Sequence, residues 1–207
     1  MQRFIEEQNV AHFQQLLSRE TKEEARRILR SLLANSQRKL AMIEASTRGT
    51  YSNPQVVREQ LFPHAAPKMT SCFQREFEAA TKPLLLLDPG PGLHIVDANK
   101  AYAAAAMIDA SKVAGEKIFD VFPDNPDDPA ADGVANLFSS LSIAATTGRS
   151  HAMAVQRYDV RDSGGAFVER YWQPVNSPIL NEAGKLVFIL HQVIDVTAQY
   201  MEIQKVA

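Results

Sequence analysis

The residue best suited to chemistry is His191, because it interrupts an otherwise apolar stretch, KLVFILHQVIDVTAQY at residues 185–200. The ordinary pKa of histidine lies closest to neutral pH, and its ring nitrogens can donate or accept hydrogen bonds. If His191 is buried, its pKa should be perturbed, and it could act as a pH-sensitive switch or contact a ligand. A lone histidine on a strand also has a structural interpretation, in which it simply bonds a neighbouring polar group. The sequence leaves both interpretations open.

Few other residues are arranged for catalysis or metal binding. Cys72 is the only cysteine, so no disulfide can form within the chain and no cysteine-rich metal site is possible. The DPGPG segment at 88–92 lacks the lysine of a phosphate-binding loop and indicates a turn. The acidic DNPDDPAAD segment at 124–132 lacks the ligand spacing of a calcium loop, which favours a solvated loop. We therefore expect no enzymatic activity and no metal.

The charge and hydropathy of the chain argue against several classes of protein. The net charge is −2 and no basic stripe is present, which argues against nucleic-acid binding. No apolar run reaches the roughly 18 residues that suggest a membrane span. The charged, amphipathic start of the chain, MQRFIEEQNVAHFQQ, is unlike a secretory signal. We expect a cytoplasmic protein that does not bind membranes.

The stretch that contains His191 predicts a strand whose two faces are both covered. Side chains alternate between the faces of a sheet, so a strand with one wet face should alternate between apolar and polar residues. Residues 186–194 do not alternate in this way. An uncovered row of Phe188, Leu190 and Ile194 would be an adhesive patch, so a helix or a second subunit should cover it.

The chain divides into a helical segment, a linker and a small α+β domain. Residues 1–46 carry apolar residues at helical spacing and contain no glycine or proline, which predicts a helical hairpin with its own core or a dimerisation element. Thr21 followed by Glu24 predicts a capping box at the second helix. Residues 47–70 read as a linker with a helical turn at 55–61. From residue 71 the expected order is a short helix, two strands, three helices and a meander of three strands at 150–160, 166–180 and 185–194.

This order of helices and strands, together with several sequence segments, resembles the PAS family of sensor domains. The segments are FEAATKPLLLLD, IVDANKAY, GEKIFDVFPD and the closing GKLVFILHQVIDVT, and the resemblance covers about residues 71–197. The resemblance implies a five-stranded antiparallel sheet with helices on one face, preceded by the N-terminal helical segment. It further implies that residues 198–207 begin an output helix after a signal junction at Asp195 and Thr197, where the same residues would also cap the helix.

Comparison with flavin-binding members of that family implies which side chains face the ligand pocket. The resemblance gives as ligand-binding candidates His191, Trp172, Asn176, Arg157, Tyr158 and Val193. It gives as outer-face or dimer candidates Phe188, Leu190, Ile194, Tyr171 and Val175. A photochemical flavin would need a cysteine in the GEKIFDVFPDNP region, where there is none, and Cys72 lies far away. A haem could still use His94, His151 or His191, but the long helix that usually supplies the ligand contains no histidine, so the cofactor is left unassigned.

The resemblance implies a sensory module that acts through dimerisation and a small-molecule pocket. It is similar to PAS domains upstream of bacterial sensor histidine kinases, so we expect a homodimer with a downstream kinase or effector partner in a two-component system. The alternative is a stand-alone interaction module that binds protein and no ligand.

Overall fold

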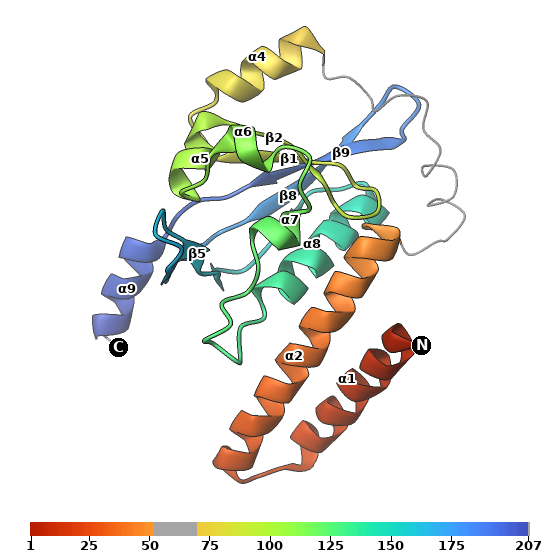
Figure 1. The fold of residues 1–207 in the computed structure, drawn as a ribbon, viewed down its shortest axis with the longest axis vertical. Coiled ribbons are helices and arrows are strands. Elements are labelled where there is room, and N and C mark those ends of the chain that lie inside the picture. The colour runs from red at the N-terminus through yellow and green to blue at the C-terminus, as the bar shows by residue number, and fades with distance from the viewer. Residues whose placement is uncertain (52–69, 207) are drawn as a thin grey trace.

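The computed structural model of the chain describes residues 1–51 and 70–206 (Figure 1). Its helices are α1 (Gln2–Arg19), α2 (Glu23–Arg48), α4 (Ser71–Ala79), α5 (Lys100–Ala105), α6 (Ala110–Val113), α7 (Ile118–Val121), α8 (Gly133–Thr147) and α9 (Thr197–Val206). Its strands are β1 (Leu84–Leu87), β2 (Ile95–Ala98), β3 (His151–Ala152), β4 (Gln156–Arg157), β5 (Val160–Arg161), β6 (Phe167–Val168), β7 (Tyr171–Trp172), β8 (Val175–Leu180) and β9 (Leu186–Gln192). The helical turn predicted at 55–61 lies outside the described residues.

Five strands form one antiparallel sheet in the order β2-β1-β9-β8-β3. The first strand, β1, therefore pairs with the last, β9, in the middle of the sheet, and the helices between them must cross one face. This confirms the predicted α+β fold with a five-stranded antiparallel sheet. None of the described helices is both long enough and apolar enough to cross a membrane.

The apolar strands in the middle of the sheet are covered on both faces. All four leucines of β1 are buried, although successive side chains point to opposite faces. Leu85 and Leu87 join the core under the inner helices, together with Ile189 of β9. Leu84 and Leu86 join a second core on the outer face, where Phe188 packs with Phe77 of α4. Helix α4 therefore supplies much of the cover that the sequence of β9 requires (Figure 1).

The strands predicted at 150–160 and 166–180 are interrupted rather than continuous. β3 pairs with β8 in the main sheet, whereas β4–β7 and β5–β6 form separate two-stranded ladders. Pro174 separates β7 from β8, and proline has no N–H with which to continue a ladder. Its carbonyl still accepts a hydrogen bond of 2.9 Å from the N–H of Met153. The hairpin is thereby divided into pieces that curve around the helices.

The N-terminal helices form the predicted hairpin, and α2 is also part of the sheet domain. Ala41 and Ala45 of α2 are buried in the inner core, and α2 runs alongside α8 (Figure 1). The predicted capping box is wrong because the N-cap position is Lys22, one residue beyond Thr21. The carboxylate of Glu20 instead accepts the N–H groups of both residues at 2.8 Å.

The end of α2 is fastened to the turn between β1 and β2. Gly49 has a φ of 63°, and an added Cβ there would lie 2.3 Å from the carbonyl oxygens of Pro89 and Gly90. The N–H of Gly92 donates to the carbonyl of Ala45 at 2.7 Å. This close approach of two backbones fixes the position of α2 on the domain.

Candidate functional site

A cavity of about 50 Å³ lies against the inner face of the sheet, enclosed by helices and by the curved hairpin. Of the predicted ligand-binding residues, His191, Trp172, Tyr158 and Val193 line it. Its other lining residues are Tyr102, Ala106, Phe122, Gly133, Leu137, Met153, Gln156, Val160 and Pro174. Typical pockets for drug-sized ligands measure about 300–1,000 Å³, so this one suits a much smaller molecule.

His191 is the start of a chain of hydrogen bonds that crosses the sheet. Its Nδ1 lies 2.7 Å from Oδ1 of Asn176, its neighbour on β8. Nδ2 of Asn176 donates to the hydroxyl of Ser140 on α8 at 2.7 Å. That hydroxyl lies 2.7 Å from Nδ1 of His151 on β3. Asn176 is fully buried and lies behind His191, so its place is beside the cavity and not on its wall.

Burial keeps His191 neutral. Loss of hydration lowers its pKa from 6.5 to about 4, since the charged form would be placed in an apolar wall. The ring of Tyr102 contacts it edge-on, with centroids 6.0 Å apart. The structural interpretation offered by the sequence is confirmed, because Nδ1 is bonded to a neighbouring side chain. Contact of His191 with a ligand stays a prediction, for which the ring is placed in the cavity wall.

Two aromatic residues of the hairpin at 151–180, Trp172 and Tyr158, form part of the cavity wall. Nε1 of Trp172 donates to the carbonyl of Tyr158 at 2.8 Å. The hydroxyl of Tyr158 donates to the carbonyl of Phe122, beyond α7. Burial raises the pKa of Tyr158, so this phenol stays protonated. These bonds tie the hairpin to the inner helices and fix the rings in the wall.

Tyr102 is a cavity residue that the sequence did not reveal as one. It lies on α5, whose N-cap Asn99 accepts the N–H of Tyr102 at 2.9 Å. Burial raises the pKa of its hydroxyl, and that hydroxyl makes no hydrogen bond within the described residues. A signal for it exists in the sequence: Tyr102 is the only aromatic side chain in the alanine-rich run at 100–108.

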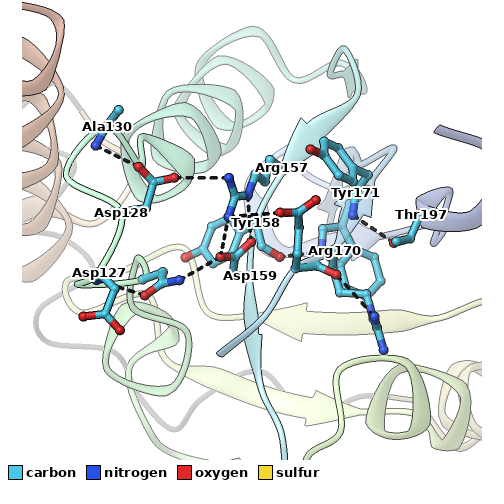
Figure 2. Close-up of polar contacts among 12 residues, drawn as sticks. Asp127, Asp128, Ala130, Arg157, Tyr158, Asp159, Arg170, Tyr171 and Thr197 are labelled. Carbon is cyan, nitrogen blue, oxygen red and sulfur yellow. Dashed lines mark hydrogen bonds and ion pairs between the residues drawn. The ribbon is translucent and has the colours of Figure 1, made fainter. Parts of the chain in front are cut away.

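Arg157 departs from its predicted place in the pocket. It neighbours Tyr158, and because the tyrosine points inward, Arg157 points outward. Its guanidinium lies 3.1 Å from Asp159, 3.3 Å from Glu169 and 3.5 Å from Asp128 (Figure 2). The hydrogen bond and charge of Asp159 raise the pKa of Arg157. Arg157 therefore organises a surface ion-pair cluster and adds no charge to the cavity.

The fold can be compared with known proteins. A family described as the PAS fold matches residues 77–201. The chain belongs to the PAS-fold family. No curated protein matches the chain. Among solved structures, an RNA-binding light-oxygen-voltage receptor has 18% identity and a TM-score of 0.47, with 74% of this chain and 38% of the receptor covered.

Two further solved structures are similar in size to this PAS domain. The PAS domain of a protein from Colwellia psychrerythraea has 15% identity and a TM-score of 0.46, with 60% of this chain and 94% of that one covered. The PAS domain of the fruit-fly ELK potassium channel has 13% identity and a TM-score of 0.46, with 63% of this chain and 99% of that one covered. This chain thus spans well under half of the receptor but almost the whole of these two domains.

The exit of the PAS domain has the predicted cap. Asp195 accepts the N–H of Thr197 at 2.9 Å and also its hydroxyl proton. The hydroxyl oxygen of Thr197 in turn accepts the N–H of Tyr171 at 2.9 Å, which ties the start of α9 to β7 (Figure 2). The ring of Tyr171 stacks on Tyr200 of α9, with centroids 4.0 Å apart. The junction thus couples the direction of α9 to the hairpin that walls the cavity.

The outer-face candidates differ in how far the chain itself covers them. Phe188 is buried under α4, and Leu190 packs at the edge of the same core. Tyr171 is partly covered by α9 through its stacking on Tyr200. Val175 is half-buried, whereas Ile194 is 46% exposed. Among these five candidates, Ile194 is therefore the most exposed.

The remaining candidates for cofactor chemistry do not converge on the cavity. Cys72 is exposed on α4, on the opposite face of the sheet. His94 bonds the carbonyl of Gly115 through Nδ1, and neither it nor His151 lines the cavity. Across residues 1–51 and 70–206, no group of three or more His, Cys, Asp or Glu side chains is placed to hold a metal ion.

Proposed function

We propose that the chain is the sensory module of a bacterial signal-transduction protein, the input part of a two-component sensor histidine kinase. A small molecule binds in the inner cavity, and its presence changes the setting of the helices at the ends of the domain. Kinase activity would lie outside this chain, and the module itself has no catalytic role. A ligand can shift such an equilibrium only by its difference in affinity for the two states, commonly about 1–3 kcal/mol.

The observation that carries this proposal is a mostly apolar cavity with two buried polar groups in its wall. His191 and Tyr102 are buried, yet Nε2 of the histidine and the hydroxyl of the tyrosine have no hydrogen-bond partner in the described residues. Buried polar groups normally have partners, so these two are expected to meet one in the cavity. The hairpin that forms the far wall is bonded to α9, which supports a route from cavity to output.

Native mass spectrometry of protein purified under mild conditions tests the ligand. The proposed function predicts a bound small molecule, or one taken up from a cell extract, that is lost on denaturation. A cavity that stays empty in both samples would favour the stand-alone interaction module, whose output is a docking surface. Reading the coding sequence beyond residue 207 tests the kinase output separately.

Dimerisation through the N-terminal hairpin is the second part of the proposal. Helix α1 has no buried residue. The hairpin exposes a set of large apolar side chains, namely Phe4 63%, Ile5 48%, Leu16 39%, Ile28 55% and Leu32 41%. A second copy that packs on this hairpin would cover these side chains, and each large one fully buried stabilises by about 1.5–3 kcal/mol.

Ile28→Glu should weaken the homodimer at least tenfold, because a charge would enter an apolar interface and about 1.4 kcal/mol corresponds to a factor of ten. Sedimentation velocity over a range of concentrations measures the change. Arg27→Glu is the matched control, since Arg27 is exposed on the same helix and the substitution also introduces a carboxylate. A wild-type chain that sediments as a monomer at all concentrations would refute this role of the hairpin.

A further inference from the structure

We infer that the cavity binds a small, uncharged molecule with an O–H or N–H group, which donates a hydrogen bond to Nε2 of His191. This inference rests on the proposed function and adds the chemical class of the ligand. It follows from the direction of the hydrogen bonds behind the histidine, from the Tyr102 hydroxyl that has no hydrogen-bond partner among the described residues, and from the size of the cavity.

The chain of hydrogen bonds fixes which ring nitrogen of His191 carries the proton. Nδ2 of Asn176 donates to Ser140 and also faces Sδ of Met153 at 3.7 Å, so the amide oxygen is turned toward His191. That oxygen can only accept, which places the proton of the neutral ring on Nδ1. The hydroxyl of Ser140 accepts from Asn176 and lies 2.7 Å from Nδ1 of His151, to which it can donate. With the proton of the neutral ring on Nδ1, Nε2 of His191 is left as an acceptor.

Nε2 of His191 has no hydrogen-bond partner among residues 1–51 and 70–206. The hydrogen bonds of His191 within the described residues end at Asn176, and the residue lines the cavity. Among buried side-chain nitrogens and oxygens described, the only one both enclosed by protein and unbonded is Nε of Arg170, so Nε2 of His191 borders free space. The hydroxyl of Tyr102 likewise borders free space and has no hydrogen-bond partner among the described residues. The cavity therefore presents one acceptor and one hydroxyl that can donate or accept.

The size of the cavity and the cost of burying a charge limit which ligands can bind. A volume of about 50 Å³ has room for roughly three to five water-sized groups, since one water needs about 10–15 Å³ of such space. A charged ligand would lose its hydration in a mostly apolar cavity and would find no counter-ion in Arg157, which points away from the cavity. A short-chain alcohol has the required features: an O–H for His191, an oxygen for the Tyr102 hydroxyl and a small apolar end.

Ethanol and acetonitrile are matched probes, since each has three non-hydrogen atoms but only ethanol has an O–H. Nitrogen NMR of the His191 ring in the full chain, titrated with each, tests the inference. Ethanol should shift the Nε2 resonance saturably, with a dissociation constant in the millimolar range that so small a ligand permits. Acetonitrile should bind at least tenfold more weakly. Tyr102→Phe, which removes a hydroxyl without a hydrogen-bond partner in the described part of the chain, should weaken ethanol binding at least threefold.

Ser140→Ala tests whether the chain of hydrogen bonds behind His191 fixes the tautomer of its ring. It should leave the fold intact but mix the two tautomers of His191 and lower ethanol affinity, whereas Ser142→Ala on the same helix should do neither. Equal binding of the two probes, a proton on Nε2 in the wild type, or water that ethanol does not displace would each overturn the inference. If a larger ligand is found by native mass spectrometry while neither probe binds, the donor class is wrong and the proposed sensory function stands.

Discussion

Asn99→Asp should lower the free energy of unfolding by about 3–5 kcal/mol, because it removes a buried amide donor and places a carboxylate among carbonyl oxygens. Asn99 is 2% exposed and joins α4, β1 and α5. Its Oδ1 accepts the N–H of Leu84 at 3.0 Å and that of Tyr102 at 2.9 Å. Its Nδ2 faces the carbonyls of Phe77 at 3.3 Å, Ala80 at 3.2 Å and Lys82 at 2.8 Å.

The substitution tests the donor of this amide apart from its acceptor, since aspartate keeps the acceptor oxygen and loses the NH2 donor. Asn181→Asp is the matched control, because Asn181 is exposed and its side chain only accepts, from the N–H groups of Ala183 and Lys185. The control should change stability by about 0.5 kcal/mol or less. Urea unfolding measures both variants. A loss below about 1 kcal/mol for Asn99→Asp would mean that the side chain of Asn99 is not what holds α4, β1 and α5 together.

The wild-type chain should lose about 3 kcal/mol of unfolding free energy between pH 6.5 and pH 4 relative to His191→Gln. The pKa of His191 falls from 6.5 in the unfolded chain to about 4 in the folded one. Between these values the unfolded state binds the proton and the folded state does not, so acidification favours unfolding. At about 1.4 kcal/mol per pKa unit the full effect is reached near pH 4, and above pH 6.5 it vanishes.

Glutamine is chosen because it is neutral at every pH in the window and can still donate to Asn176. Other groups titrate in both proteins, including Asp97 and Asp132, whose pKa values burial raises. Their contribution cancels in the difference between the two curves. Parallel stability curves for wild type and variant, measured by urea unfolding at each pH, would show that His191 is not buried as a neutral ring.

Much of the fold could be predicted because its signals are local. The leucines of β1 and the apolar residues 186–190 of β9 both require cover on two faces, and the motif order places the two strands in one sheet. The sequence does not decide whether a helix or a second subunit covers the outer face. In the structure, Phe77 of α4 supplies much of that cover. The breaks in the hairpin depend on Pro174 and on how the chain curves around the helices, which no local pattern specifies.

The site could be predicted only where it depends on alternation along a strand. His191 and Trp172 face inward as expected, and Tyr158 lines the cavity while its neighbour Arg157 cannot, because adjacent side chains point to opposite faces. Tyr102 and Ser140 come from helices whose rotation is set by packing over the sheet. Their meeting with His191 and Asn176 is a long-range contact that spacing in the sequence does not encode.

The central claim is that the cavity wall contains a neutral imidazole held as a hydrogen-bond acceptor. Nitrogen NMR of the His191 ring, followed from pH 8 to pH 4 in the unliganded chain, tests it most directly. The account predicts a single neutral tautomer, protonated on Nδ1, whose titration has its midpoint near pH 4. A midpoint near the ordinary value of 6.5, or a proton on Nε2, would contradict it.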